Sequence, residues 1–375
     1  MEIYANNFLK LIASQKQQGT LYCAGLDVHA FGKPGQTLKE KLDANLSVYG
    51  AFTDGADIQS LRKVYRSVAM YLPGLKDTEP LINIVTNVEV YLSKVIDVMV
   101  LNCGIRVFKP QSAFYEQFGP IGLVLLARVR NYITTLENDL NEPITVLLDC
   151  KRGDISTTQE AYFTALLGGL SDSWGVEYKP FDFDIINVTP WMGSDVMGLK
   201  NDSGSAGLGL KLMKEGKGLI IVNKSSNPSG PEYQELTTER ILTVQMSNVY
   251  DAYQMNLDYE LETDGISTIG LVVGSTHQCD GSIREAFPST TLLVPGFGAQ
   301  GGKFGLIMPE LIAGGKHEGF GAIFSSSRGS MFPFLPKLGG SGNVANLAED
   351  MKAAVSNFRK NEKLAYEEFG IKYPF

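Results

Sequence analysis

Eight short apolar segments recur along the chain and are separated by longer stretches of mixed polarity. Most positions within each segment are apolar, without the clean polar–apolar alternation of a half-buried strand. This is typical of parallel strands that are buried on both faces. The segments cover residues 21–26, 104–108, 145–148, 184–188, 218–222, 268–273, 291–294 and 321–324.

Several of the stretches between these segments show helical periodicity. Three apolar stripes, which we interpret as helix faces packed on a core, are formed by Ile121, Leu125, Val129, Tyr132 and Ile133, by Ile241, Val244, Val249 and Tyr250, and by Leu347, Met351, Val355 and Phe358. Eight strands with helices between them predict an α/β fold, the (β/α)₈ TIM barrel. In this fold the chemistry takes place at the C-terminal ends of the strands.

The spacing of the segments predicts one barrel domain over residues 1–375 with two additions. About 77 positions separate Asp27 from Gly104, which is more than one crossover helix needs. We therefore expect residues 33–84, rich in Gly, Asp and Lys, to be an insertion between the first and second strands. Residues 339–375 are expected to form a C-terminal helical extension.

Polar, charged or glycine-rich residues follow every predicted strand. Asp149, Lys151 and Asp154 stand within six residues at the end of the third strand. Charges of alternating sign held so closely shift one another's proton affinity and suit a proton-transfer site. Asp27 and Lys109 follow the first two strands and extend this network. The structural alternative is a set of buried ion pairs that closes the barrel, but such pairs contribute weakly to stability.

The loop after the seventh strand, residues 295–302, contains four glycines, which let backbone N–H groups approach a ligand. Arg328 follows the eighth strand and offers a forked donor. Barrels often bind phosphate with the loops after strands seven and eight. The two features together therefore predict a phosphate site.

Composition and charge narrow the class of protein. The 375 residues carry a net charge of −8, which argues against general affinity for nucleic acid or an anionic membrane. Hydrophobic residues make up 44% of the chain and charged residues 20%, which argues against disorder. No segment has the pattern of a signal peptide or a bilayer-spanning helix. We expect a soluble, cytoplasmic protein.

Cysteine and histidine usage limits the possible chemistry. The four cysteines show no paired spacing, which favours buried, reduced thiols over disulfides or a zinc site. No Gly-x-Ser-x-Gly elbow stands at a strand end, and only three histidines exist, so Ser-His-Asp catalysis and a His-rich metal site are disfavoured. His29, close after Asp27, is a candidate to line the barrel mouth.

Several motifs resemble one known family. Residues 149–158 resemble the D-x-K-R-G-D-I-x-x-T signature of orotidine 5′-phosphate decarboxylase, in its longer bacterial branch. Residues 108–116 resemble the second-strand motif of that family, and residues 226–228, 294–302 and 327–329 match further motifs in the right order. Two departures stand out: Ser156 replaces a usual glycine, and Thr189 replaces a common asparagine before Pro190.

The resemblance implies a role for each matching residue. Lys151 would protonate C6 of the pyrimidine as carbon dioxide leaves, with Asp149 beside the substrate carboxylate. Asp154 and Thr158 would reach into the site of the neighbouring subunit, so that a homodimer shares its active sites. The substrate-binding residues implied are Asp27 and Lys109 for the ribose, Ser226 for the pyrimidine amide, Gln300 and Arg328 for the phosphate, and Ser327. Gln300 would also lie near the base, and Lys109 is counted with Asp149, Lys151 and Asp154 among the catalytic residues.

The resemblance thus implies decarboxylation of orotidine 5′-monophosphate to uridine 5′-monophosphate, the last step of de novo pyrimidine nucleotide synthesis, without a metal or an organic cofactor. Two alternatives are a Mg²⁺-dependent sugar-phosphate decarboxylase of the same barrel type and a non-catalytic nucleotide-binding barrel. The matches at Pro110, Gln111 and 226–228 favour the pyrimidine nucleotide. The complete set Asp149, Lys151 and Asp154 argues against a protein that only binds.

Overall fold

Eight parallel strands close into a barrel in this computed structural model, which describes residues 3–29, 36, 37, 40, 46–72, 77–168, 179–276, 278–297 and 302–375. The order around the barrel is β1-β10-β9-β8-β5-β4-β3-β2. All eight predicted strands are confirmed: β1 (Tyr22–Gly25), β2 (Val107–Lys109), β3 (Thr145–Arg152), β4 (Ile185–Val188), β5 (Gly218–Lys224), β8 (Ile269–Val273), β9 (Thr291–Pro295) and β10 (Ala322–Ser326). β6 (Glu262–Thr263) and β7 (Ile266–Ser267) form a small antiparallel pair outside the barrel.

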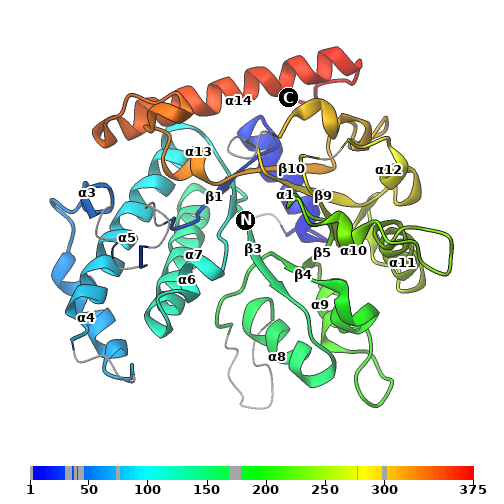
Figure 1. Ribbon diagram of the computed structural model, residues 1–375, viewed down its shortest axis with the longest axis horizontal. Coiled ribbons are helices and arrows are strands. Elements are labelled where there is room, and N and C mark those ends of the chain that lie inside the picture. The colour runs from blue at the N-terminus through cyan, green and yellow to red at the C-terminus, as the bar shows by residue number, and fades with distance from the viewer. Residues whose placement is uncertain are drawn as a thin grey trace.

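Helices surround the barrel (Figure 1). The longer ones are α4 (Ile58–Ala69), α5 (Glu79–Asp97), α7 (Pro120–Leu140), α8 (Ser156–Leu166), α11 (Val244–Asp258) and α14 (Leu347–Phe369). Shorter helices are α3 (Leu46–Tyr49), α6 (Ala113–Glu116), α9 (Leu208–Lys214), α10 (Pro231–Gln234), α12 (Ser282–Ala286) and α13 (Arg328–Met331). A π-helix η1 (Val98–Asn102) extends α5, and the 3₁₀ helices are η2 (Pro190–Met197), η3 (Phe304–Leu306), η4 (Met308–Glu310), η5 (Pro336–Leu338) and η6 (Val344–Asn346).

Two of the three predicted apolar stripes lie on helix faces as expected. In α7 and α14 the stripe residues are buried or partly buried against the core. The stripe around α11 is wrong in two places. Ile241 is 86% exposed because it lies before the helix, in a turn with a left-handed backbone (φ +62°), and Tyr250 is 45% exposed. The spacing of apolar residues over a short stretch of sequence does not distinguish a turn from the helix that follows it.

A further helix, α1 (Asn7–Gln18), closes the N-terminal end of the barrel and is not among the elements predicted from periodicity. Its polar side chains bond to backbone at the starts of strands: Asn7 donates to the carbonyl of Asp184, and Gln15 to that of Ala322. Phe8 is fully buried, and a Cβ added to Gly218 or Gly270 would lie about 3 Å from its ring. Glycine at these positions leaves room for Phe8, so the opposite end of the barrel is left to hold a site.

Lys10 of α1 forms a buried ion cluster at this closed end. Its Nζ lies 2.8 Å from Glu137 Oε1 and 2.9 Å from Asp184 Oδ1. Burial by itself would raise the pKa of Asp184, but Lys10 and Arg130 outweigh it, so this pKa is lower than usual. The cluster ties α1 to α7 and β4.

The described part of residues 33–84 contains α3, α4 and the start of α5. α4 packs on α5 and α7 at one side of the barrel, on the left of Figure 1. Tyr65 of α4 is buried and donates to Glu89 of α5, which also accepts from Arg128 of α7 at 2.8 Å. This region is therefore attached to the barrel through buried polar contacts as well as apolar ones.

Within residues 339–375, α14 lies along the outside of the barrel near β1 and β10 (Figure 1). Glu362 is fully buried and accepts a hydrogen bond from the backbone N–H of Leu21 at 2.8 Å. Arg359 donates to the carbonyls of Gln18 and Cys103. α14 thus ties the end of the chain to the start of the first strand.

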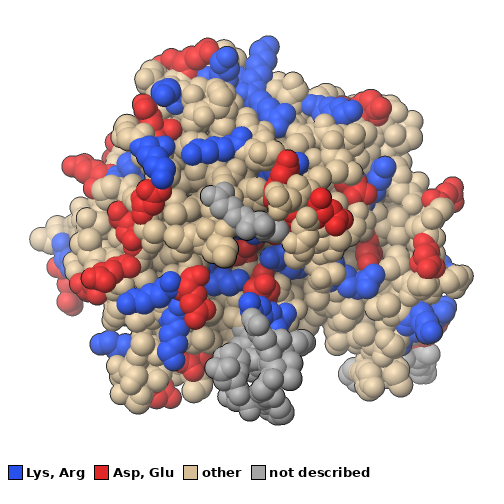
Figure 2. Space-filling model, turned by 180° about the vertical axis from the view of Figure 1, so that it is seen from behind, with Lys and Arg blue, Asp and Glu red and all other residues tan. Residues whose placement is uncertain are grey.

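Figure 2 shows how charged side chains are distributed over one face of the molecule. Acidic and basic side chains are interspersed over the face shown in Figure 2. None of the helices in the described ranges combines the length and the apolar character that crossing a bilayer requires.

The connection from β3 to α8 contains two backbone constraints. A Cβ at Gly153 would lie 2.4 Å from Thr189 Oγ1 and 2.7 Å from the Thr189 carbonyl oxygen, so only glycine fits. Ser156 has a left-handed backbone (φ +48°), which costs a residue with a Cβ about 1–2 kcal/mol. Ser156 is the position at which the sequence departs from a usual glycine, and the structure shows why glycine suits it.

Both positions favour glycine, so removing a Cβ at Ser156 and adding one at Gly153 should change stability in opposite directions. Ser156→Gly removes the left-handed strain, so we expect a gain in the free energy of unfolding of up to about 1 kcal/mol. Gly153→Ala forces β3 away from the Thr189 backbone and should cost about 1–3 kcal/mol. Urea unfolding of both variants measures this. A Gly153→Ala protein as stable as the wild type would contradict the close approach of these strands.

Candidate active site

A cavity of about 380 Å³ lies at the C-terminal ends of the barrel strands, and side chains at or just beyond the ends of all eight strands line it. Seven of the ten site residues predicted from the sequence line this cavity: Asp27, Lys109, Asp149, Lys151, Ser226, Ser327 and Arg328. Residues more than 300 positions apart in the chain are therefore brought to one place, as the barrel expectation required.

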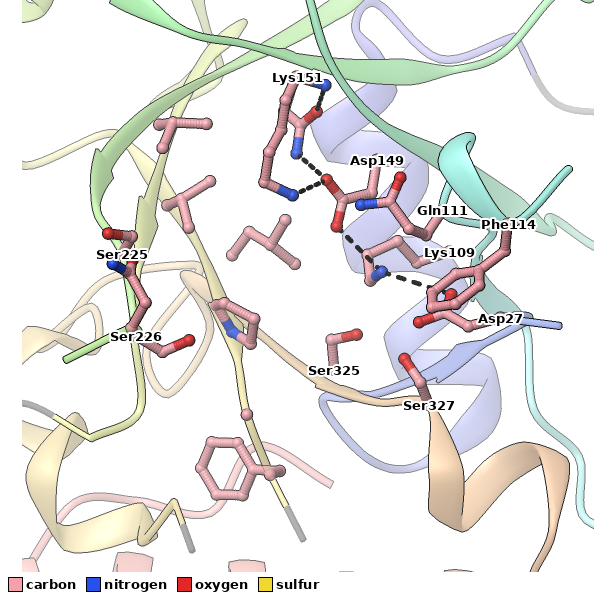
Figure 3. A pocket seen from close by; sticks show the side chains of 18 of the residues that line it. Asp27, Lys109, Gln111, Phe114, Asp149, Lys151, Ser225, Ser226, Ser325 and Ser327 are labelled. Carbon is pink, nitrogen blue, oxygen red and sulfur yellow. Dashed lines mark hydrogen bonds and ion pairs between the residues drawn. The ribbon is translucent and has the colours of Figure 1, made fainter. Parts of the chain in front are cut away.

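Asp149 is the centre of the charge network in this cavity (Figure 3). Its Oδ1 lies 2.5 Å from Lys151 Nζ, and its Oδ2 lies 3.2 Å from Lys109 Nζ. Lys109 Nζ is also 3.9 Å from Asp27 Oδ1. Carboxylates and ammonium groups thus alternate from β1 across β2 to β3.

Burial distinguishes the two lysines. The side chain of Lys109 is 4% exposed, whereas that of Lys151 is 46% exposed. Lys109 is thus enclosed between two carboxylates, while the Lys151 ammonium is open to the cavity. Of these two lysines, Lys151 is the one that can approach a bound molecule with little rearrangement.

The cluster keeps its charges despite burial. Burial by itself would raise the pKa of Asp149, but the ammonium groups of Lys109 and Lys151 and a hydrogen bond from Asn187 outweigh it, so this pKa lies well below its usual value. Burial would likewise lower the pKa of Lys109, and the carboxylates of Asp27 and Asp149 raise it above its usual value instead. Asp149 is therefore an anion and Lys109 a cation at neutral pH.

Asn187 of β4 lies against this network and was not predicted from the sequence. Its side chain donates to Asp149 Oδ1 at 2.7 Å and accepts from the backbone N–H groups of Cys150 and Lys151. Lys151 has a left-handed backbone (φ +47°) within an interruption of the β3–β4 ladder. The sequence offers one signal for this role. Asn187 is an amide residue among apolar neighbours in the fourth predicted strand, and charged residues follow the third predicted strand.

His29, Gln111 and Phe114 also line the cavity near Asp27. The ring of His29 meets that of Phe114 edge to face, with centroids 4.6 Å apart. Burial lowers the pKa of His29, and the nearby cations Arg328 and Lys109 lower it further against the effect of Asp27. His29 is therefore mostly neutral at pH 7.

The remaining polar wall comes from the loops after β5 and β10. Ser225 and Ser226 lie across the cavity from Asp27 and Lys109 in Figure 3. Ser327 precedes the short helix α13, and Arg328 is its first residue. A cation beside a short helix in this position is the arrangement that barrels use for phosphate. Gln300, predicted as a further phosphate ligand, lies outside the described residues.

Asp154 and Thr158 do not line the cavity of their own chain. Asp154 lies beyond the end of β3, where its Oδ1 accepts from the backbone N–H of Ile155 at 2.8 Å. Thr158 is exposed on the first turns of α8. The structure therefore separates these two residues from the Asp149–Lys151 pair with which they share a motif.

The donor set of the cavity suits an anionic, hydrogen-bonding ligand. Two lysines and an arginine line it together with four serines (Ser225, Ser226, Ser325 and Ser327) and two asparagines, Asn187 and Asn227. Within the described ranges, no three His, Cys, Asp or Glu side chains are grouped so that they could hold a metal ion.

Comparison with known proteins adds independent evidence. The sequence model of the Orotidine 5'-phosphate decarboxylase / HUMPS family matches residues 94–329. The chain is 32% identical over 225 residues to the orotidine 5'-phosphate decarboxylase of Rhodopirellula baltica, across 60% of this chain and 67% of that protein. It is 30% identical over 268 residues to that of Caldicellulosiruptor bescii, across 69% of this chain and 78% of that protein.

Solved structures agree in fold. The orotidine 5'-monophosphate decarboxylase of Plasmodium berghei superposes with a TM-score of 0.63 at 15% identity, covering 96% of this chain and 99% of that one. The Leishmania donovani OMP decarboxylase gives 0.56 at 21% identity, covering 96% and 98%. At these identities the likeness shows the barrel fold alone. From the family match and the curated relatives, this chain belongs to the orotidine 5'-phosphate decarboxylase / HUMPS family.

Proposed function

We propose that this chain decarboxylates orotidine 5′-monophosphate to uridine 5′-monophosphate, the last step of de novo pyrimidine nucleotide synthesis. One observation carries the proposal. An accessible Lys151 ammonium is held 2.5 Å from the buried carboxylate of Asp149, in a cavity that Arg328 also lines. In this arrangement Lys151 is a proton donor for C6 of the pyrimidine, and Arg328 is a cation for the phosphate.

The proposed reaction is a replacement of carbon dioxide by a proton at C6. The bond from C6 to the carboxyl carbon breaks, carbon dioxide leaves, and the electron pair remains on C6. Lys151 Nζ then gives one proton to C6 and becomes a neutral amine, which takes up a proton again from water. A fixed ammonium beside C6 stabilises the developing negative charge before it transfers the proton. The residues therefore supply both needs of the step, charge stabilisation and a proton.

The other cavity residues are proposed to bind and position the nucleotide. Asp27 and Lys109 would hold the ribose hydroxyls, and Ser226 the amide edge of the pyrimidine. Ser327 and Arg328, together with Gln300, would bind the phosphate. Phosphate binding far from C6 supplies energy that can be realised in the transition state. Asp149 would lie beside the substrate carboxylate and hold the Lys151 ammonium by their ion pair.

We propose that the active protein is a homodimer with shared sites. Asp154 and Thr158 lie outside their own cavity, which is the position needed to reach a neighbouring one. Apolar side chains are exposed near them: Ile155 is 44% exposed and Trp191 71%, and the Trp191 ring lies 5.0 Å from that of Tyr233. Exposed apolar patches of this kind mark protein interaction sites.

We place this activity in the cytoplasm and expect no nucleic-acid partner. All four cysteines are buried and none forms a disulfide, as is usual in a reducing compartment. The net charge of −8 disfavours general affinity for a polyanion, and acidic and basic side chains are interspersed on the face in Figure 2.

The decisive assay is the fall in absorbance when orotidine 5′-monophosphate is added to the purified chain after treatment with EDTA. We expect conversion without added metal, because Lys151 supplies the positive charge and the proton. No conversion with or without Mg²⁺ would reject the proposed function. Activity that is lost with EDTA and restored by Mg²⁺ would favour the metal-dependent alternative.

Lys151→Ala should lower kcat by at least about 10³-fold, because the variant lacks both the fixed cation and the proton donor. Its affinity for uridine 5′-monophosphate, measured by calorimetry, should stay within about tenfold of the wild type, because the phosphate and ribose ligands remain. Near-normal product formation by this variant would show that another group donates the proton.

Mixing two inactive variants tests the shared site. A Lys151→Ala subunit keeps Asp154, and an Asp154→Ala subunit keeps Lys151, so one of the two sites in a mixed dimer carries both residues. We expect up to about one quarter of the wild-type activity per total subunit after exchange, from random pairing of the two chains. No recovery after subunit exchange has been verified would rule out a site shared across the interface.

A further inference from the structure

The backbone pairing of β3 with β4 is interrupted where β3 carries its charged residues, and Asn187 lies opposite this interruption. Leu148 pairs with Ile186 and Arg152 pairs with Val188, so β3 places three residues where β4 places one. That one residue is Asn187, which is 1% exposed. Its side chain occupies the gap in the ladder.

The Asn187 amide is held by three hydrogen bonds. Oδ1 accepts from the N–H of Cys150 at 2.8 Å and from the N–H of Lys151 at 2.7 Å, and Nδ2 donates to Asp149 Oδ1 at 2.7 Å. The opposite orientation of the amide would set an NH₂ group against two N–H donors and an oxygen against a carboxylate. The network therefore permits one orientation only.

Through these bonds one side chain acts on both members of the reactive pair. It fixes the Asp149 carboxylate from one side, and it fixes the backbone of Lys151 in its left-handed conformation (φ +47°). The Lys151 side chain is long, flexible and 46% exposed, so its position depends on these two anchors, its own backbone and the Asp149 Oδ1 that binds its ammonium.

We propose that Asn187 is the positioning residue of this site: it sets the place of the Lys151 ammonium relative to C6 of the substrate, through the carboxylate and through the backbone. This inference rests on the proposed decarboxylation. Asn187 lines the cavity but carries no charge and takes no part in proton transfer; it acts through Asp149 and Lys151.

The charged groups that face Asp149 come from two strands. Lys109 approaches from β2 and Lys151 from β3, while Asp27 of the β1 end faces Lys109. Asn187 is the contact from β4. Without its N–H, Asp149 Oδ1 keeps only the hydrogen bond from the Lys151 ammonium, while Oδ2 keeps Lys109. The carboxylate then loses one of the three contacts that fix its orientation.

Three variants test the proposal. Asn187→Leu keeps the approximate size of the side chain and removes all three hydrogen bonds. Asn187→Asp keeps the acceptor for the two backbone N–H groups but sets a second carboxyl group against Asp149. The matched control is Asn256→Leu in α11, where a buried amide makes no hydrogen bond to the described residues and does not line the cavity.

We expect kcat of Asn187→Leu to fall about 100-fold, because a displacement of the reacting group by about 1 Å costs this much. The dissociation constant for uridine 5′-monophosphate should stay within about threefold, because no proposed nucleotide ligand is removed. Asn256→Leu should retain the kcat of the wild type.

The pH dependence of Asn187→Asp separates positioning from a general structural role. Two adjacent carboxyl groups share one proton, which raises the pKa of one of them. Below that pKa the introduced group is protonated and can donate to Asp149 as the amide does; above it the two anions repel. The ratio of variant to wild-type kcat should therefore rise at least about fivefold from about pH 8 to about pH 6, whereas the ratio for Asn187→Leu should stay flat.

Unchanged kcat in Asn187→Leu overturns the proposal. So does a loss of kcat that is matched by an equal loss of nucleotide affinity. If the wild type does not convert orotidine 5′-monophosphate, the proposed function is wrong, and hydrogen exchange measured by NMR still decides the role of Asn187. The N–H of Lys151 should then exchange at least about tenfold faster in Asn187→Leu and near the wild-type rate in Asn187→Asp. Equal exchange in all three proteins overturns the proposal.

Discussion

The site depends on the ion pairs and the hydrogen bond that the Asp149 carboxylate accepts. It accepts from Lys109 of β2, Lys151 of β3 and Asn187 of β4, so three adjacent strands meet at one buried anion. Burying a carboxylate is costly unless it is paired and hydrogen-bonded. Because buried ion pairs add little to stability, this cluster is better explained by the chemistry of the cavity than by the needs of the fold.

The rest of the barrel makes this arrangement possible. Helix α1 closes the N-terminal end with Phe8, in the space left by Gly218 and Gly270, and the buried Lys10 cluster ties it to the strands. The open end is thus the C-terminal one, where the strand ends bring their polar residues together. All eight barrel strands run in the same direction, so all their C-terminal ends meet at one end of the barrel. That end carries the polar residues, and the N-terminal end is closed by buried side chains.

The charged residues of the motif at the end of β3 lie in two different environments. Asp149 and Lys151 line the cavity of their own chain, whereas Asp154 lies past the close approach of Gly153 to Thr189 and is not among the lining residues. Residues five positions apart are therefore separated by the turn between strand and helix. This separation underlies the proposal of a site completed by a second subunit, with Trp191 and its exposed neighbours beside it.

The sequence by itself determined the barrel and the charged part of the site. The strand pattern is local, and every parallel strand of a barrel delivers the residue after it to the same rim, so Asp27, Lys109, Asp149, Lys151 and Arg328 could be placed together without coordinates. Only the tertiary structure decided the role of α1, the burial that separates Lys109 from Lys151, and the contact of Asn187 with Asp149, 38 positions away. These depend on which side chains of neighbouring strands face each other, and on the interruption of the β3–β4 ladder, which no local periodicity encodes.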